Sequence, residues 1–180
     1  MNLAEKVIST KRIYDGKILN LRVDTVLLPD GREAKREIVE HKGAIAVVPL
    51  LDTTKVLMVK QYRRSAGEVL LEIPAGVMEK DEDAETSANR ELMEEIGYKA
   101  GKLTKMCSTF LAPGYSEEML HIFLAEDLVP ARAKADDDEF IEVVTIELND
   151  AVKMIRSGEI KDAKTASGLL MAQQMIGELK

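Results

Sequence analysis

The sequence predicts an α/β protein in which a mixed sheet packs between helices. Short segments rich in Val, Ile and Thr alternate with turn residues along most of the chain, which is typical of strands. One long helical segment interrupts this series near the middle, and further helical segments close the chain. Strands flanked by helices in this order favour a sheet that is covered on both faces.

The N-terminal part of the chain is expected to form a β region of its own. Turn sequences, Asp15-Gly16 and Pro29-Asp30-Gly31, separate strand-like segments at residues 6–14, 19–28 and 33–41. So few strands make a thin sheet that needs another surface to be stable, and a second subunit is one way to supply it. We therefore divide the chain into an N-terminal β region, residues 1–41, and a larger domain, residues 42–180.

The larger domain should alternate strands with helices. Strands are expected at residues 43–51, 55–62, 69–73, 102–111, 119–125 and 140–146, and helices at residues 83–96, 148–157 and 163–179. Gly158 should end the second helix, and Gly97 stands where a left-handed C-terminal cap would end the first.

The composition is that of a soluble globular protein. Its 180 residues, 46% hydrophobic and 32% charged, fit one domain with a sizeable core. A net charge of −7 argues against non-specific binding to nucleic acid, which depends on Lys and Arg. No apolar run approaches the roughly 20 residues needed to span a bilayer, and the start lacks a signal segment. The single cysteine, Cys107, cannot form an internal disulfide, so we expect a cytoplasmic protein.

Residues 76–98 are the most informative part of the sequence. On the predicted helix Glu91, Glu94 and Glu95 share one face, because residues three and four apart are neighbours. The other face carries an apolar stripe that can dock on a sheet, formed by Ala84, Ala88, Leu92 and Ile96. Converging carboxylates repel one another, so the acidic face is either simply solvated or binds a divalent cation. The spacing of these residues alone leaves both interpretations open.

A wider pattern surrounds this helix and has glycine or polar residues at fixed spacings: Gly76, Glu82, Arg90, Glu91, Glu94, Glu95 and Gly97. The pattern resembles the signature of the Nudix hydrolases, which cleave nucleoside diphosphates linked to another moiety. Tyr98 departs from the signature at a position that is usually aliphatic, and Asp81 stands where many members have glycine. Asp tolerates a positive φ less readily than glycine, so Asp81 bears on the backbone of this loop.

The resemblance implies a fold and a metal site. The fold is the Nudix α/β/α sandwich with a mixed sheet, and the N-terminal antiparallel sheet is exchanged in a homodimer. Carried over by position, the main metal ligands are Glu91 and Glu95, with Glu94 assisting and the carbonyl of Ala75 adding a further oxygen. Arg90 would orient the glutamates, which Lys would do poorly. Glu82 would support the loop. The cation would be Mg²⁺, with Mn²⁺ as a substitute.

The catalytic base is expected outside this motif. In similar Nudix enzymes it lies on an acidic loop before a late strand, which corresponds by position to residues 136–139. Glu139 is the first candidate, as base or as an additional metal ligand, and Asp137 is the second. A solvated acidic turn is the alternative. No nucleophilic Ser-His-Asp set is apparent in the sequence, so water activated by the metal and an acidic side chain is the expected nucleophile.

Features outside the motif resemble the ADP-ribose pyrophosphatase subgroup. They are the position of Pro113 after Tyr98, the entry residues 72–76, the segments 61–63 and 36–40, and the loop 113–118. The resemblance implies substrate contacts from Arg36, Glu37, Arg63, Gly76, Pro113, Tyr115 and Glu118. Arg63 would neutralise the diphosphate, since a guanidinium grips phosphate oxygens in a planar fork. A surface salt bridge for Arg36 and a turn-closing role for the loop are the alternatives.

These features together predict metal-dependent hydrolysis of ADP-ribose to AMP and ribose 5-phosphate. Another nucleoside diphosphate sugar or a dinucleotide is the alternative substrate, because the motif handles only the diphosphate. A non-catalytic ADP-ribose sensor is a further alternative, although the carboxylates of the motif are intact. We expect a homodimer with no nucleic-acid or membrane partner.

Overall fold

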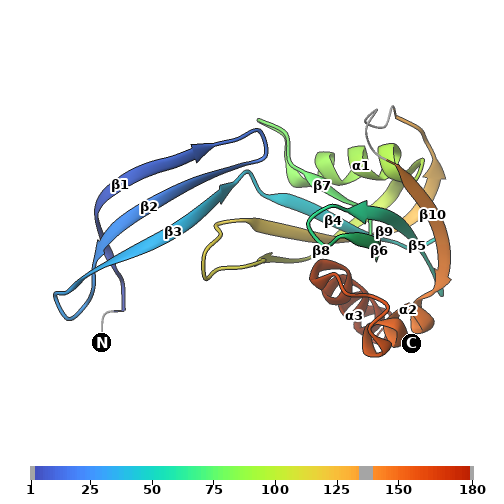
Figure 1. Cartoon of the computed structure of the whole chain (residues 1–180). Coiled ribbons are helices and arrows are strands. Elements are labelled where there is room, and N and C mark those ends of the chain that lie inside the picture. Colours follow the sequence, from blue (N-terminus) through green and yellow to red (C-terminus); the bar gives the residue numbers. More distant parts are fainter. Residues whose placement is uncertain (1–2, 134–139, 179–180) are drawn as a thin grey trace. The chain divides into compact units, whose positions relative to one another are not determined.

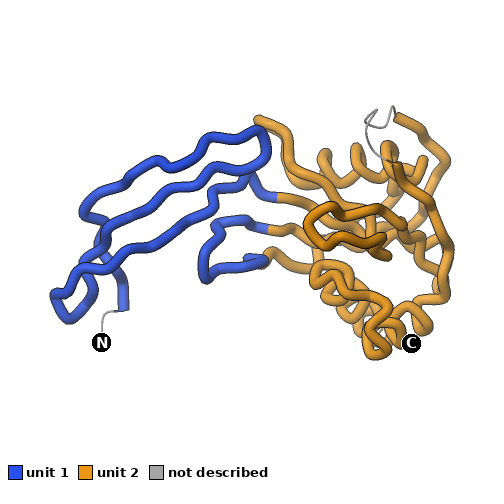
Figure 2. The backbone as a smooth tube through the Cα atoms, viewed as in Figure 1, with its two compact units in different colours: residues 1–43, 110–119 blue, residues 44–109, 120–180 orange. Residues whose placement is uncertain are grey.

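A computed structural model describes residues 3–133 and 140–178, and the chain divides into two compact units (Figure 2). Unit 1 comprises Met1–Gly43 and Phe110–Met119, and unit 2 comprises Ala44–Thr109 and Leu120–Lys180. The elements in chain order (Figure 1) are β1 (Lys6–Asp15), β2 (Leu19–Leu27), β3 (Glu33–His41), β4 (Ala44–Pro49), β5 (Lys55–Arg63), β6 (Glu68–Glu72), β7 (Ala75–Val77), α1 (Ala84–Glu95), β8 (Tyr98–Phe110), β9 (Met119–Pro130), β10 (Ile141–Glu147), α2 (Leu148–Ser157) and α3 (Ala163–Glu178).

Unit 1 is built on an antiparallel sheet of β1, β2 and β3, as the sequence predicts. Every residue of β1 is exposed, including the apolar Val7 and Ile13. The segment Phe110–Met119 belongs to this unit because it is bonded to β3: Val39 N–H donates to the carbonyl of Tyr115 at 2.8 Å, and Glu117 N–H donates to the carbonyl of Val39 at 3.1 Å. The loop predicted to recognise substrate is therefore attached to the N-terminal sheet.

Unit 2 contains the predicted mixed sheet architecture. One sheet has the strand order β7-β4-β9-β8, in which β4 is antiparallel to β7 and parallel to β9. The other sheet has the order β10-β5-β6, and its strands are antiparallel.

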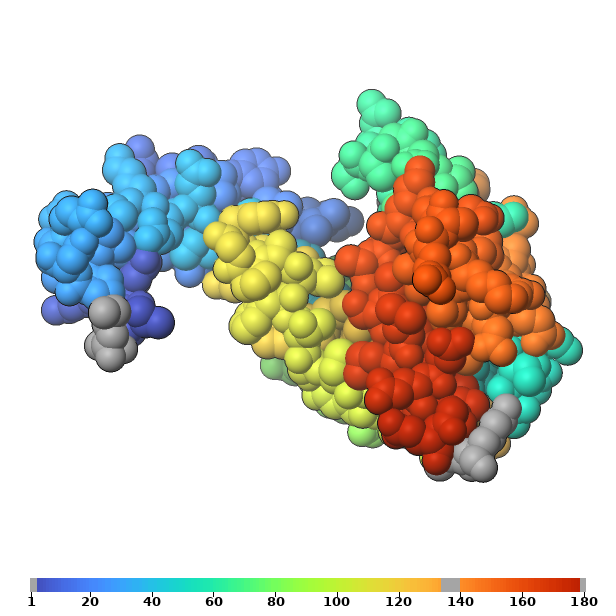
Figure 3. Space-filling model, turned by 90° about the horizontal axis from the view of Figure 1, so that it is seen from below, coloured from blue at the N-terminus to red at the C-terminus, as the bar shows by residue number. Residues whose placement is uncertain are grey.

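Helices cover both faces of these sheets, which confirms the predicted α/β/α sandwich (Figure 1). Side chains alternate along β4, so that Ile45 and Val47 belong to the core cluster that includes Leu92 of α1. Ala46 and Val48 belong to the opposite cluster, with residues of α2 and α3 such as Leu169. Figure 3 shows α2 and α3, in orange and red, gathered on their face of unit 2. Among the described residues, no helix combines the length and apolar character needed to cross a membrane.

Some element boundaries differ from the sequence prediction. Strand β7 was not expected; it forms by pairing with β4, where Ala75 lies opposite Ala46, and such pairing has no local signature. Strand β8 begins at Tyr98 and not at residue 102, because Gly97, with φ 76°, redirects the chain directly after the helix. Strand β9 continues to Pro130, beyond the predicted end at residue 125.

Candidate active site

The motif of residues 76–98 folds as β7, a loop and α1. Asp83 caps the helix, since its carboxylate accepts hydrogen bonds from the backbone N–H of Glu85 at 3.0 Å and of Thr86 at 2.9 Å. Gly97 follows the last turn in the predicted left-handed conformation. Asp81 also has a positive φ, 66°, a conformation that glycine adopts more readily than Asp. The local sequence therefore fixes both ends of the helix.

The apolar stripe of α1 packs against the sheets and thereby fixes the acidic residues. Ala88 and Leu92 are fully buried, and Ile96 is nearly so, in the cluster shared with β4 and β5. Glu91 and Glu95 lie beside this stripe, and each is only 8% exposed. A simply solvated acidic face would leave both carboxylates in water, so their burial favours the cation-site interpretation.

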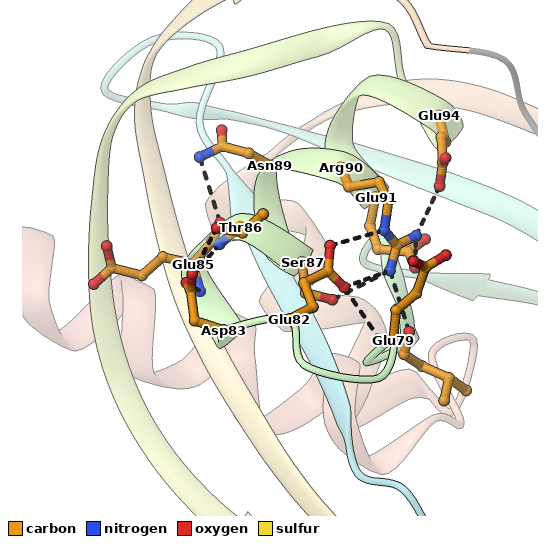
Figure 4. A network of polar contacts seen from close by, with 11 residues as sticks. Glu79, Glu82, Asp83, Glu85, Thr86, Ser87, Asn89, Arg90, Glu91 and Glu94 are labelled. Atoms are coloured by element: carbon orange, nitrogen blue, oxygen red, sulfur yellow. Dashed lines mark hydrogen bonds and ion pairs between the residues drawn. The ribbon is translucent and has the colours of Figure 1, made fainter.

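Arg90 is the centre of the polar network on this helix (Figure 4). Its guanidinium bonds Glu82 through Nε and Nη2, both at 3.1 Å. Nη1 donates to Glu91 at 2.7 Å and to Glu94 at 2.9 Å. Nη2 also reaches the carbonyl of Val77 at 3.2 Å. One guanidinium thus gathers three carboxylates of the motif and ties them to the backbone of β7, the geometry for which Arg is suited and Lys is not.

Arg90 and Glu82 stabilise each other's charged form. Burial by itself lowers the pKa of Arg90, but hydrogen bonds and charges from Glu82, Glu91 and Glu94 raise it overall. Hydrogen bonding to Arg90 lowers the pKa of Glu82, which also accepts a bond from the backbone N–H of Glu79 at 3.2 Å. Glu82 is therefore ionised at neutral pH and closes the loop between β7 and α1.

Ala75 and Gly76 of β7 lie directly against two of the buried carboxylates. Ala75 N–H donates to Glu95 Oε2 at 3.2 Å. A Cβ added at Gly76 would lie 1.9 Å from Glu91 Oε1, so the carboxylate fills the space that any side chain at this position would need. Glycine permits this close approach, and any side chain here would displace the Glu91 carboxylate.

The donors at this place fit a hard divalent cation. Carboxylates and backbone carbonyls are the oxygen ligands that Mg²⁺ and Mn²⁺ take, and Glu91, Glu95 and Glu94 supply carboxylates beside the backbone of Ala75. Within the described residues, no group of three His, Cys, Asp or Glu side chains is arranged as a finished metal site. Glu91 and Glu94 instead form ion pairs with Arg90.

Arg63, the other predicted diphosphate contact in unit 2, holds a carboxylate. Its Nε and Nη2 donate to the two oxygens of Glu72 at 2.8 and 2.7 Å, so one edge of the guanidinium is occupied. The pKa of Arg63 is raised mainly by these bonds to Glu72, and the nearby charge of Glu95 raises it further. Arg63 is joined to the acidic site through Glu72, which lies three residues before Ala75. Its predicted contact with phosphate stays a prediction.

The remaining predicted substrate contacts belong to unit 1. Arg36 pairs with Glu5, which is the surface salt bridge weighed as its alternative. Tyr115 is 62% exposed, and Glu118 lies 3.6 Å from His41 Nδ1. Glu37 lies on β3, opposite Val23. Pro113 lies in the loop that β3 holds. The two candidates for the catalytic base, Asp137 and Glu139, lie outside the described residues.

The sequence prediction assigned no role to two residues that the structure brings next to the site. Glu72, at the end of β6, is 1% exposed and pairs with Lys164 of α3 as well as with Arg63. A carboxylate directly after the apolar run of residues 69–71 was a usable signal, because buried charges are paired. Lys164 offered no such signal, since only the fold brings it to Glu72.

The chain is similar to known proteins over most of its length. Residues 40–167 match the NUDIX domain, and residues 5–39 match the nucleoside diphosphate sugar hydrolase N-terminal domain. An ADP-ribose pyrophosphatase of Bacillus subtilis (strain 168) is 45% identical over 96% of this chain and 94% of its own length. The methanol dehydrogenase activator of Bacillus methanolicus is 40% identical over 89% of this chain and 88% of its own. The crystal structure of an ADP compounds hydrolase has the same fold, with a TM-score of 0.89, 20% identity, and coverage of 99% of this chain and 98% of that one.

Proposed function

The chain belongs to the Nudix hydrolase family, and from this membership we propose that it hydrolyses the pyrophosphate bond of ADP-ribose to AMP and ribose 5-phosphate. The observation that carries the proposal is the complete motif in its folded form, with the buried carboxylates of Glu91 and Glu95 against the backbone of Ala75 and Gly76. The similarity to an ADP-ribose pyrophosphatase over nearly its whole length supports the choice of substrate.

A divalent cation is part of this proposal, with Mg²⁺ as the first choice and Mn²⁺ as a substitute. Glu91 and Glu95 would hold it, with help from Glu94, the carbonyl of Ala75 and Glu139. When bound, the cation supplies charge neutralisation for the phosphates and activation of the attacking water.

The residues of the chain hold this arrangement in place. Arg90 orients Glu91 and Glu94, and the N–H of Ala75 orients Glu95. Glu139 or Asp137 would take a proton from water as its oxygen bonds to phosphorus. The bond between that phosphorus and the bridging oxygen breaks, and the electron pair leaves with the departing phosphate. Fixed charges and dipoles of this kind lower the barrier because they need no reorganisation during the reaction.

Substrate recognition and assembly extend the proposal. Arg63 and Gly76 would contact the diphosphate, while Arg36, Glu37, Pro113, Tyr115 and Glu118 would contribute from the N-terminal region. The exposed apolar side chains of β1 support a homodimer formed through residues 1–41, with residues 42–180 as the hydrolase domain. The enzyme would act in the cytoplasm, without a nucleic-acid or membrane partner. Sedimentation velocity at micromolar protein would reveal the dimer, and a monomer would refute that part.

Release of AMP from ADP-ribose, with and without Mg²⁺, tests the central proposal. Glu95→Gln should reduce turnover by several orders of magnitude, on the order of 10³-fold, because it removes a charge needed mainly in the transition state. Glu85→Gln is the matched control, since Glu85 is an exposed residue of the same helix. Retention of near-native hydrolysis by Glu95→Gln would refute the metal assignment.

Two other functions can be distinguished by a panel of substrates and by a measurement of ADP-ribose binding. Faster cleavage of GDP-mannose or of a dinucleotide than of ADP-ribose would support a different nucleotide substrate, which the match to a nucleoside diphosphate sugar hydrolase region allows. Tight ADP-ribose binding without turnover in Mg²⁺ would support a non-catalytic sensor.

A further inference from the structure

A buried ion-pair network lies beside the acidic site, and its centre is Glu72. This carboxylate is 1% exposed and is held from two sides. Arg63 of β5 donates to both of its oxygens, at 2.8 and 2.7 Å, and Lys164 of α3 donates to Oε2. Lys164 also donates to Asp162 at 2.9 Å. Elements that are far apart in the sequence thus meet on one carboxylate.

The start of α3 is also held at this place by hydrogen bonds of Thr165. The hydroxyl of Thr165, which is fully buried, accepts the N–H of Ile73 at 3.0 Å and donates to Asp162 at 2.6 Å. Ile73 follows Glu72 directly and leads into the backbone of Ala75 and Gly76. The position of Lys164 is therefore set by the fold and does not depend on the ion pair alone.

Glu72 occupies only part of the donor capacity of Arg63. A guanidinium has five N–H donors, and the bonds from Nε and Nη2 use one of its edges. The edge formed by Nη1 and Nη2 can still grip an oxyanion with two parallel bonds. Glu72, which Arg63 holds, lies three residues before Ala75, and the N–H of Ala75 donates to Glu95, a predicted metal ligand, at 3.2 Å. The open edge thus belongs to a guanidinium that borders the site where the diphosphate would bind.

A buried ion pair of this kind is a weak source of stability. The cost of removing charges from water offsets most of their attraction, and apolar residues of similar volume often stabilise a protein as well or better. What such a network does provide is a fixed orientation for an otherwise flexible arginine, because the fork fits a carboxylate in one geometry.

We propose that Glu72 and Lys164 are positioning residues for the substrate diphosphate: Glu72 fixes the orientation of Arg63, and Lys164 holds Glu72 charged and in place. The inference rests on the proposed function, since it assumes a diphosphate substrate that Arg63 contacts. Hydrogen bonds and charges from Arg63 and Lys164 outweigh the effect of burial and lower the pKa of Glu72, so that the carboxylate is ionised at neutral pH.

The isosteric variant Glu72→Gln separates positioning from simple electrostatics. Removing a negative charge beside Arg63 would, by Coulomb attraction alone, lower the KM for an anionic diphosphate. Loss of the two bonds that fix the orientation of the Arg63 guanidinium acts in the opposite direction and raises the KM. We expect the KM for ADP-ribose to rise about tenfold, which corresponds to one charge-assisted hydrogen bond, while kcat changes less than about threefold.

A double-mutant cycle makes the test specific to Arg63. Glu72→Gln should change the KM little, less than about twofold, when Arg63→Ala is already present, because the residue acts through Arg63. A structural role for Glu72 would lower activity equally in both backgrounds. Circular dichroism and thermal unfolding of each variant show that the protein is folded before kinetics are compared.

Lys164→Met should also raise the KM for ADP-ribose. Lys164→Arg keeps the positive charge, so its KM should stay close to that of the unaltered protein. Lys161→Met is the matched control, because Lys161 makes an exposed ion pair at 2.8 Å with Glu68, which lies on β6 like Glu72.

An unchanged or lower KM in Glu72→Gln would overturn the inference, and so would additive effects in the cycle. Absence of cleavage by the unaltered protein would instead refute the proposed hydrolysis. In that case the Kd for ADP-ribose, measured by calorimetry, replaces KM in the same comparison.

Discussion

Substitution of Gly76 by alanine should separate activity from stability. The added Cβ would lie 1.9 Å from Glu91 Oε1 and 2.1 Å from Glu91 Cδ, whereas ordinary contact begins at about 3.4 Å. The Glu91 carboxylate must therefore move by about 1.5 Å. Since it is the end of a flexible side chain, the move costs little beyond the bond to Arg90, which contributes about 1 kcal/mol to unfolding free energy.

The functional cost of the same movement should be much larger. A displacement of about 1 Å at a catalytic group costs on the order of 100-fold in rate, so kcat/KM for ADP-ribose should fall at least 100-fold, or about 2.7 kcal/mol. Initial rates of AMP release across a Mg²⁺ titration measure this loss, and urea unfolding measures stability. Gly177→Ala is the control, because nothing lies within 4 Å of a Cβ at that helical position. A folded Gly76→Ala protein with kcat/KM within about threefold of the unaltered protein would refute the role of this close approach.

Three further predictions concern the network and its loop. Arg90→Lys should lower the free energy of unfolding by about 2 kcal/mol and should lower kcat/KM at least tenfold. The reason is that an ammonium cannot hold Glu82, Glu91 and Glu94 together. Unchanged urea midpoints and unchanged kinetics would contradict this prediction. Asp81→Gly should raise the free energy of unfolding by up to about 1 kcal/mol, since Asp81 has φ 66°, and a lower melting temperature would count against this. The folded-state pKa of Glu72 is depressed, so its ionised form stabilises the protein above the ordinary pKa near 4.5, and this stabilisation is lost as pH falls through the folded-state pKa. The stability difference between the unaltered protein and Glu72→Gln, measured by urea unfolding from pH 7 to pH 3, should accordingly shrink in acid, and a constant difference would contradict the shift.

Local sequence signals were sufficient for most of the fold. Alternation of apolar residues along β4 places successive side chains in two different cores, and the short apolar segments around it gave the strands their approximate bounds. Gly97 and Gly158 ended their helices with positive φ, as glycine permits at little cost. Strand β7 was missed because its pairing with β4 depends on a long-range contact that three residues cannot signal by themselves.

The candidate site was predictable as a pattern but not as a geometry. Helical spacing indicated that Glu91 and Glu95 could meet, yet it could not show that Glu91 would fill the space above Gly76. The contact between Arg63 and Glu72 was also hidden. In the hairpin of β5 and β6, Arg63 lies opposite Glu68, so its side chain must reach along the sheet to Glu72. Such contacts depend on side-chain length and packing, which a one-dimensional pattern does not record.

The charges of the site bear on how an acidic protein would bind the proposed diphosphate substrate. Arg90 pairs with three carboxylates, those of Glu82, Glu91 and Glu94, and Glu95 adds a fourth negative charge beside Ala75. The motif by itself is therefore strongly negative and would repel phosphate. The proposed divalent cation would offset part of this charge, and it would then serve substrate binding as well as chemistry. Arg63 is the complementary attraction, but a free arginine beside these carboxylates would pair with them. Glu72 occupies one edge of that guanidinium. Under the proposed function it would keep Arg63 away from the predicted metal ligands and leave the other edge for substrate.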